Sequence, residues 1–338
     1  AETFCLILLF IIMKNTVIDL ITKTAVITGA SSGVGLATAH LFAQNGYQLV
    51  LAARGVEGLE KAVSECNAFG GKAVYKSTDV SNANEVKDLV EFALKEFGRI
   101  DVWVNNAGVM ASGKFEEIPM DINEQVIKTN LMGYMHGAYY VLPVFKEQNQ
   151  GILINNVSIG GYMPAPFSSV YSATKTGIKG LMSGLQSEYS VYPEIHICNV
   201  YPQVQQSTGN MHSAKFSGLD FKIPPFAADP KDTAKVIYNL INKPKNDTFP
   251  DATSFMLKLE HGAFPETFTN LATGVLRLMM KVKKGKADEG NVLQPSTDPY
   301  AVYGKMAIPV PTKTNQKIIG TSLVFAAGFF VAKHLKNK

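Results

Sequence analysis

The sequence of 338 residues is poor in cysteine, and its three cysteines lie far apart. Cys5, Cys66 and Cys198 form no C-x-x-C pair, which argues against a disulfide framework, a zinc site and a redox dithiol. We therefore expect no bound metal. A reducing, cytoplasmic compartment is the default for this composition.

Positive charge is scarce outside one end of the chain. The formal net charge is +4, but four lysines gather at positions 281, 283, 284 and 286, and five more lie within 313–338, which has no acidic residue. Without these nine lysines the chain is net acidic, so we expect no nucleic-acid partner. The lysines favour either an anionic membrane surface or a solvated face.

Long apolar runs are absent as well. Phe4–Met13 has ten apolar residues and Ile318–Ala332 has fifteen uncharged ones, whereas a spanning helix needs about 17 to 25. We expect residues 1–19 to be an N-terminal apolar extension and 313–338 to be an apolar tail. The tail is either a membrane anchor, helped by snorkelling lysines, or a helix packed in an oligomer; its exposed phenylalanines favour the membrane.

What the sequence does contain, first, is a strand, a glycine-rich turn and a helix in succession. Thr24–Thr28 is a β-branched run, and an apolar-periodic segment, Leu36–Gln44, follows the turn. Glycines let backbone amides approach a pyrophosphate, and a helix N-terminus offers unpaired N–H groups. The turn therefore predicts a dinucleotide site, with Gly29, Ser31, Ser32, Gly33, Val34 and Gly35 as its residues.

A second predicted strand, Tyr47–Ala53, ends at Arg54. An acidic residue at this place would bind a ribose 2′-hydroxyl, whereas an arginine can pair with a 2′-phosphate. We therefore expect NADP(H) to be preferred over NAD(H). The alternative is that Arg54 only caps a solvated turn.

Strands and helices continue to alternate along the first half of the chain. Lys72–Thr78 and Ile100–Val104 are predicted strands, and Ala83–Phe97 between them is a predicted helix. Asp79 and Val80 follow the third strand, where the adenine edge would lie. The alternation predicts a doubly wound parallel sheet, a three-layer α/β/α Rossmann fold.

A serine, a tyrosine and a lysine stand out in the segment 151–180. Ser158 follows a buried apolar run, and Tyr171 begins a predicted helix with Lys175 four residues later on the same face. A nearby ammonium favours the phenolate and is expected to lower the pKa of Tyr171. A tyrosine of this kind is a plausible acid, and a serine hydroxyl can hold the same substrate oxygen.

In order and spacing these motifs resemble the short-chain dehydrogenase/reductase family, in its single-domain branch. The shared features are Thr28-Gly29-x-x-x-Gly33-x-Gly35, Asp79, Asn105-Asn106-Ala107-Gly108, Asn130, Ser158, Tyr171-x-x-x-Lys175 and Pro202. The match covers about residues 20 to 245. It implies a catalytic Rossmann domain at 20–245, followed by a C-terminal extension at 246–312 that contains a lid or amphipathic helix and a linker.

The resemblance also implies a role for each matching position. Tyr171 would be the general acid or base, Ser158 would orient the substrate oxygen, and Lys175 would hold the nicotinamide ribose. Asn130 would position a water in a proton relay. The implied cofactor pocket further includes Asn106, Ala107, Gly108 and Pro202. Homo-oligomers are common among such proteins, so an oligomer is expected here.

One departure from the family pattern follows Pro202, where Gln203 replaces a glycine. Glycine would permit an unusual backbone angle, so a different local turn is expected. The glutamine- and phenylalanine-rich stretch 203–228 predicts either a mobile flap over an apolar substrate or a loop packed by its own side chains. Residues 270–286 predict an amphipathic helix, and 287–315 predict an extended linker.

Together these observations predict an NADP(H)-dependent oxidoreductase that reduces an apolar ketone or aldehyde, or oxidises the matching secondary alcohol. Lipid-like substrates fit the apolar flap and tail, which suggests a place in lipid metabolism. One alternative is a 3-oxoacyl thioester reductase, which would use the same catalytic residues. An alternative of another class is a sensor or scaffold that binds NADP(H) without turnover.

Overall fold

The computed structural model of the chain describes residues 22–219, 223, 227–266, 269–270, 273–274, 277, 286–297 and 299–304. The predicted N-terminal extension, the apolar tail and most of the predicted amphipathic helix lie outside these residues, as does part of the predicted flap. In the part of the chain that is described, no helix is long and apolar enough to cross a membrane.

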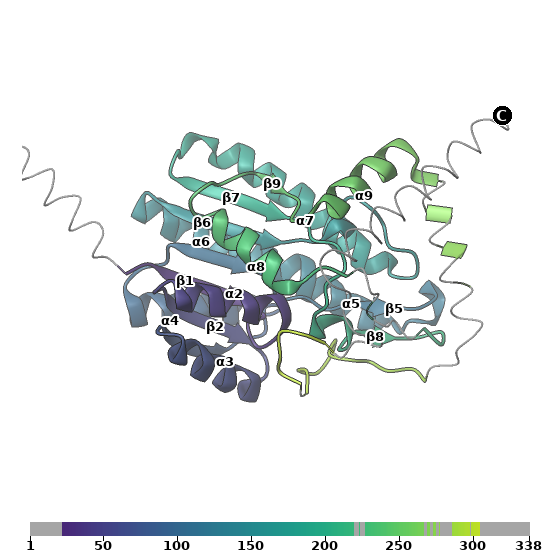
Figure 1. Ribbon diagram of the computed structural model, residues 1–338, viewed down its shortest axis with the longest axis horizontal. Coiled ribbons are helices and arrows are strands. Elements are labelled where there is room, and N and C mark those ends of the chain that lie inside the picture. The colour runs from purple at the N-terminus through teal and green to yellow at the C-terminus, as the bar shows by residue number, and fades with distance from the viewer. Residues whose placement is uncertain are drawn as a thin grey trace, which may run out of the picture.

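The centre of the fold is a seven-stranded parallel sheet with the order β3-β2-β1-β4-β6-β7-β9 (Figure 1). The chain fills one half of the sheet first and then crosses back to β4, which places the topological switch point between β1 and β4. The last strand along the chain, β9, begins at Asp247, two residues after the predicted end of the catalytic domain at residue 245. The strands are β1 (Thr24–Thr28), β2 (Gln48–Ala53), β3 (Lys72–Ser77), β4 (Val102–Asn105), β6 (Gly151–Asn156), β7 (Ile195–Val200) and β9 (Asp247–Thr248).

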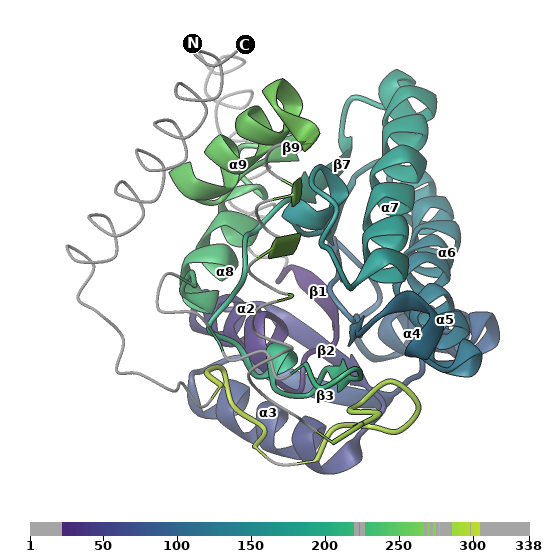
Figure 2. The same ribbon diagram turned by 90° about the vertical axis from the view of Figure 1, so that its right-hand side faces the viewer.

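Helices cover both faces of this sheet and complete the predicted three layers (Figures 1 and 2). One face carries α2 (Gly33–Gln44), α3 (Val56–Ala68) and α8 (Pro230–Asn239), and the other carries α4 (Ala83–Phe97), α6 (Gly133–Gln148) and α7 (Ser169–Glu188). The remaining helices are α5 (Met120–Ile127) and α9 (Ala252–Ala263). The short turns are η1 (Phe115–Glu117), π-helical η2 (Lys128–Met132), η3 (Ile159–Gly161), η4 (Tyr189–Val191) and η5 (Thr208–Asn210).

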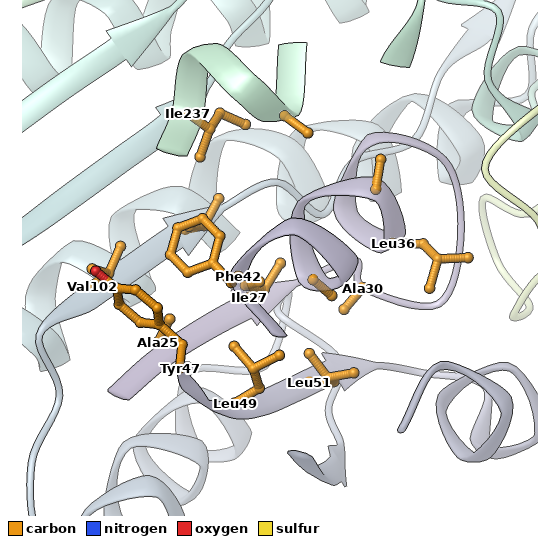
Figure 3. Packing of buried hydrophobic residues seen from close by; sticks show 14 of the residues in the cluster. Ala25, Ile27, Ala30, Leu36, Phe42, Tyr47, Leu49, Leu51, Val102 and Ile237 are labelled. Atoms are coloured by element: carbon orange, nitrogen blue, oxygen red, sulfur yellow. The ribbon is translucent and has the colours of Figure 1, made fainter. Parts of the chain in front are cut away.

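The core lies on both faces of the sheet because alternate residues of each strand point to opposite sides. Along β1, Ala25 and Ile27 pack toward α2 and α8, whereas Val26 packs toward α4 and α6. Figure 3 shows the first of these clusters, in which Phe42 of α2 lies between the strands and Ile237 of α8. Strands that are buried on both faces appear in the sequence as continuous apolar runs. This is why the strands in the first half of the chain could be predicted from the sequence.

Two strand boundaries differ from the prediction for local reasons. Ile100 is buried but not in β4, because its backbone N–H and carbonyl bond the side-chain amide of Gln148 at 3.0 and 2.6 Å. Tyr47 likewise precedes β2, since its N–H donates to the Phe42 carbonyl in the turn after α2. A polar side chain or a helix end thus takes the bond that a neighbouring strand would have taken.

Much of the predicted flap is packed rather than free. Residues Ala214–Lys215 form β8, which pairs with β5 (Ala111–Ser112) in a second, two-stranded sheet. Phe216 and Leu219 beyond it are buried. Among the described residues, the alternative of a loop packed by its own apolar side chains is therefore the better description.

The predicted linker is wrong for its first part, because residues 286–304 dock against the domain. Asp288 exchanges two backbone hydrogen bonds with Lys215, and Val292 is completely buried beside β5 and β8. The Gly304 N–H donates to the Gln206 carbonyl at 3.0 Å. The segment is rich in turn-forming residues, but its backbone polar groups find partners on the body of the protein.

Candidate active site

Ser158 lies just beyond β6, at the carboxyl edge of the sheet where ligands of parallel α/β folds bind. Its hydroxyl accepts a hydrogen bond from the Gly160 N–H at 3.1 Å, which opens the short helix η3. The flanking N–H groups of Val157 and Ile159 donate to Val200 and Pro202. Ser158 itself has φ +117°, a conformation that costs energy outside glycine and that is typical of functional sites.

Tyr171 and Lys175 lie on the face of α7 that points to Ser158, as their spacing predicts. Gly160 marks the meeting point. A Cβ placed on it would be 3.4 Å from Tyr171 Cε1, 3.5 Å from Ser158 Oγ and 3.9 Å from Lys175 Cβ. The three side chains therefore converge on one small volume although they come from two separate elements.

The Lys175 ammonium is buried among aromatic rings. It lies 4.9 Å from the ring centroid of Tyr134 and 5.6 Å from that of Tyr171. Among the described residues it has no hydrogen-bond acceptor, and burial lowers the pKa of Lys175 to about 7. A buried donor without an acceptor is suited to receive hydroxyl groups of a ligand.

Tyr134 is a part of this site that sequence reasoning missed. It belongs to α6, is 1 % exposed, and its hydroxyl donates to the Asn156 carbonyl at 2.6 Å. Its ring thus supports the Lys175 ammonium while its hydroxyl holds the end of β6. The only sequence signal is an aromatic residue four positions after Asn130, which is uninformative until α6 and α7 are packed together.

The expected lowering of the Tyr171 pKa is not found in the structure. Burial raises the pKa of Tyr171 above its ordinary value, and the nearby Ser158 hydroxyl acts in the opposite direction without cancelling it. Lys175 does little to lower the pKa of Tyr171, because burial favours the neutral form of the lysine. The phenol is therefore protonated at neutral pH, which is the form that an acid requires.

Asn130 lies in the π-helical turn η2, between α5 and α6. Its side-chain oxygen accepts from the Val109 N–H at 2.8 Å, and its amide donates to the Val109 carbonyl and to Thr174 Oγ1 at 2.9 and 3.2 Å. A Cβ on Gly108 would lie 3.2 Å from Asn130 Oδ1 and 3.9 Å from Lys175 Nζ. Asn130 therefore joins the β4 loop to α7 directly beside the lysine.

The glycine-rich loop has the shape that the motif predicts. Gly29 and Gly33 have φ of +65° and +57°, which other residues rarely adopt. The Asn106 amide donates to the carbonyls of Thr28 and Gly29 at 2.9 and 3.2 Å, and the Ala107 N–H donates to the Thr28 hydroxyl. The loop between β1 and α2, with Ser31 and Ser32 in it, is thereby fixed against the end of β4, and Val34 follows in the first turn of α2.

We expect Gly35→Ala to abolish tight binding of both NADPH and NADH and to lower Tm. An added Cβ would lie 2.1 Å from the Gly29 carbonyl oxygen, a backbone atom that cannot rotate away. Dinucleotide titration and thermal unfolding measure the two effects. Gly184→Ala on α7 is the control, since its Cβ meets nothing within 4 Å and stabilises the helix by up to about 1 kcal/mol. Unchanged dinucleotide affinity in Gly35→Ala would contradict the assignment of this loop.

At the predicted adenosine end of the site, the surroundings of Arg54 differ from the prediction. Arg54 is only partly exposed and does more than cap a turn: its guanidinium donates to the carbonyls of Val292 and Gln294 at 3.0 and 3.1 Å, and also to that of Asn291. Asp79 accepts from the N–H and hydroxyl of Ser81, and the Val80 carbonyl bonds His136 Nδ1. The three predicted residues line one edge, but the C-terminal segment covers Arg54.

Gln203, the departure from the family glycine, is accommodated without a left-handed backbone. Its N–H donates to Ser254 Oγ, and its side-chain amide donates to Asp251 Oδ1, both at 3.2 Å. Both acceptors belong to the start of α9, so this helix provides the partners that shape the turn after Pro202. In the described part of the chain no cluster of His, Cys, Asp and Glu is suited to a metal ion.

These residues fit a nicotinamide dinucleotide. The loop at 29–35 offers close backbone approach and the N-terminus of α2, as a pyrophosphate needs. The acceptor-less ammonium of Lys175 beside Asn130 suits ribose hydroxyls, and Tyr171 with Ser158 suits a carbonyl oxygen.

Comparison with known proteins agrees with this geometry. The family model described as short chain dehydrogenase matches residues 23–216. An uncharacterised oxidoreductase of Listeria innocua is 40% identical over 181 residues, which are 53% of this chain and 73% of the relative.

Two solved structures share the fold. The alcohol dehydrogenase of the archaeon Thermococcus sibiricus, complexed with 5-hydroxy-NADP, has a TM-score of 0.60 and 28% identity over 68% of this chain and 95% of its own. A short-chain dehydrogenase/reductase of Burkholderia phymatum, in complex with NAD, has a TM-score of 0.65 and 26% identity over 72% and 94%. The chain therefore belongs to the short-chain dehydrogenase/reductase family and is an oxidoreductase of that family.

Proposed function

We propose that the protein is an NADP(H)-dependent oxidoreductase that reduces an apolar ketone or aldehyde, or oxidises the matching secondary alcohol. The observation that carries the proposal is the convergence of Ser158, Tyr171 and Lys175 beside Gly160. An acid, a hydrogen-bond donor and a cation around one point suit a carbonyl oxygen that gains a proton.

The proton transfer follows from the protonation states of the site. Tyr171 is a neutral phenol at pH 7 because burial raises its pKa, so it can donate its proton to the carbonyl oxygen during reduction. The Ser158 oxygen accepts from Gly160, and its O–H, which points to the Tyr171 hydroxyl, can donate instead to the carbonyl oxygen of a substrate bound there. When bound, the nicotinamide would supply the hydride to the carbonyl carbon.

Lys175 and Asn130 act behind the tyrosine. The lysine is within reach of the Tyr171 ring and would hold ribose hydroxyls, which would favour its charged form and stabilise the phenolate left after proton donation. Asn130 uses its amide on Val109 and Thr174, and one lone pair of its oxygen is left to hold a water that returns the proton. A relay from solvent through Asn130 and Lys175 to Tyr171 is part of the proposal.

Preference for NADP(H) rests on Arg54. The two solved relatives bind 5-hydroxy-NADP in one case and NAD in the other, so the family resemblance leaves the preference open. Arg54 follows β2, at the place of the ribose 2′ position, and it keeps a charged guanidinium that can pair with a phosphate. We expect Ser31 and Ser32 to complete the phosphate contacts.

We expect Arg54→Gln to lower the preference for NADPH over NADH by about ten- to a hundredfold, because one or two charge-assisted hydrogen bonds to the 2′-phosphate are lost. Isothermal titration with each dinucleotide measures both constants. Lys87→Gln, at an exposed side chain of α4 away from this site, is a matched loss of charge. Equal affinity of the parent for both dinucleotides would contradict the assignment of Arg54.

The apolar substrate class is supported by what surrounds Tyr171. Val170 and Tyr171 pack against the third apolar cluster, which is formed by residues of the β4–α5 region, β8 and the C-terminal segment: Val109, Ala111, Ile118, Ile122, Val126, Ala214, Phe216 and Val292. A substrate that reaches Tyr171 from this side contacts apolar rather than charged side chains. Lipid-like carbonyl compounds would bury their chains here favourably.

Turnover of NADPH by the full chain on carbonyl compounds of increasing chain length tests the proposal. We expect activity that rises with chain length. Thioesters of 3-oxo acids belong in the same panel, because they would react through the same three residues. Tight binding of the dinucleotide without turnover of any compound would instead indicate a sensor or scaffold.

Two further parts of the proposal concern assembly. Exposed apolar side chains follow one another from α5 into α6, namely Met120, Ile127, Met132, Met135 and Tyr139, and Tyr139 is 71% exposed. Such a patch suits a second copy of the chain.

The membrane association expected from residues 313–338 lies outside the described residues and is tested by fractionation of the full chain and of a chain ending at Pro311.

A further inference from the structure

The segment 291–304, of which residue 298 is outside the described residues, lies across the proposed adenosine and pyrophosphate site. We call it the strap. It is the yellow-green stretch that passes below β8 toward α2 in Figure 1 and beside α3 in Figure 2. Its contacts fall on three groups that the glycine-rich motif and the end of β2 assign to a dinucleotide.

The first contact is at the N-terminus of α2. The Gly33 N–H donates to the carbonyl oxygen of Ala301 at 2.9 Å, and Thr208 Oγ1 donates to the same oxygen at 3.3 Å. The first N–H groups of a helix have no partner within the helix and are the donors that a pyrophosphate would take. The Ala301 oxygen therefore stands where a phosphate oxygen would bind.

The second contact is at Arg54, whose guanidinium donates to the strap carbonyls of Asn291, Val292 and Gln294. Carbonyl oxygens satisfy the N–H groups but carry no formal charge, and the nearby Asp79 carboxylate offsets the charge of the arginine only in part. Hydrogen bonds to a phosphate are charge-assisted and roughly twice as strong as those to neutral acceptors. A 2′-phosphate would therefore compete well for this side chain.

The third contact is the ring of Tyr300, which lies on the start of α3. A Cβ on Gly58 would be 2.5 Å from Tyr300 Cδ1 and 3.0 Å from Ser31 Cβ, so the ring seals the gap between the glycine-rich loop and α3. Lys61 Nζ donates to the Tyr300 carbonyl at 3.0 Å, and the tyrosine is 8% exposed. The strap thus covers the loop as well as the arginine.

The strap is anchored at both ends, and several side chains between the anchors are exposed. Before it, Asp288 pairs with Lys215, and at its end Gly304 bonds Gln206. Leu293, Gln294 and Pro295 between these anchors are exposed. Loss of the contacts with Arg54, Gly33 and Gly58 would free the segment between the anchors, and the anchors would keep it close to the site.

We propose that the strap is an autoinhibitory segment that must leave the cleft before the ADP half of NADP(H) can bind. This inference rests on the proposed function and adds its regulation. Because the strap is tethered, it competes at a high local concentration and lowers the apparent affinity by the fraction of molecules in which it is closed. A protein or surface that draws the strap away would raise the affinity for the cofactor.

A reversible lock tests the proposal. An ideal Cβ on Gly55 lies 3.5 Å from the Pro295 Cβ, within the spacing of a disulfide, and the φ of −83° at Gly55 suits any residue. Gly55→Cys with Pro295→Cys, in a full chain carrying Cys5→Ser, would join the strap to the end of β2 on oxidation. The two cysteines of the described chain, Cys66 and Cys198, are buried.

The readout is NADPH binding by titration calorimetry, without any turnover. We expect the oxidised protein to lose measurable binding, at least a hundredfold, and the same sample to recover it after reduction. Equal tight binding in both states would overturn the strap proposal and leave the proposed function standing. Absence of NADPH and NADH binding in the parent and in every form would overturn both.

A variant that opens the strap gives the complementary result. Tyr300→Ser removes the ring from the start of α3 and should tighten NADPH binding by about tenfold, as expected when a closed fraction near nine-tenths is released. Leu293→Ala, at an exposed side chain of the same strap, should leave the affinity unchanged. Weaker binding in Tyr300→Ser would show that the strap helps to hold the cofactor, and would overturn autoinhibition.

Discussion

Replacement of Tyr171 by phenylalanine is expected to lower kcat for carbonyl reduction by about a thousandfold, within the range that a positioned general acid contributes. The ring stays, so the packing of α7 against the apolar cluster and the contact with the Lys175 ammonium are kept. Only the hydroxyl that gives up the proton is lost. The affinity for NADPH should therefore change little, which separates chemistry from binding.

The measurement is a single-turnover rate with saturating NADPH, accompanied by a binding titration. Tyr189→Phe, just after the end of the same helix, is the matched control and should retain the parent rate. Because burial raises the pKa of Tyr171, the parent should keep its acid form, and its reduction rate, through neutral pH. A Tyr171→Phe enzyme as fast as the parent would rule out this residue as the acid.

The layered sheet and the convergence of Ser158, Tyr171 and Lys175 were predictable because their signals are local. A buried parallel strand is a short apolar run, and the turn from β1 to α2 is marked by Gly29, Gly33 and Gly35. The serine follows one such run, and the i, i+4 spacing places Tyr171 and Lys175 on one helix face. Residue type and short spacing were sufficient for each of these.

The covering of Arg54 was not predictable, because its partners are backbone carbonyls about 240 residues away. Every residue has a backbone carbonyl, so no residue type in the sequence indicates this contact. Tyr134 was missed for a related reason: its role depends on the packing of α6 beside α7, which the sequence does not display. The raised pKa of Tyr171 is a third case, since the strength of desolvation depends on the assembled core.

We expect Lys175 to support catalysis while lowering the free energy of unfolding of the protein. A free lysine has a pKa near 10.5, whereas burial lowers that of Lys175 to about 7. Between these values the unfolded chain binds one proton more than the folded chain, so stability should rise with pH from about 7 to about 10.5. The penalty is largest at pH 7 and below, where the folded protein must either release the proton or bury the charge.

Lys175→Met should therefore unfold at higher denaturant concentration than the parent at pH 7, by the equivalent of several kcal/mol, while losing at least a hundredfold in kcat. The advantage should shrink as the pH approaches 10, because the parent no longer carries the penalty. Urea unfolding at pH 7 and pH 9.5 measures this, with the exposed Lys87→Met as control. A constant stability difference at both pH values would mean that Lys175 keeps an ordinary pKa, and the ammonium would then have to be satisfied by the protein alone.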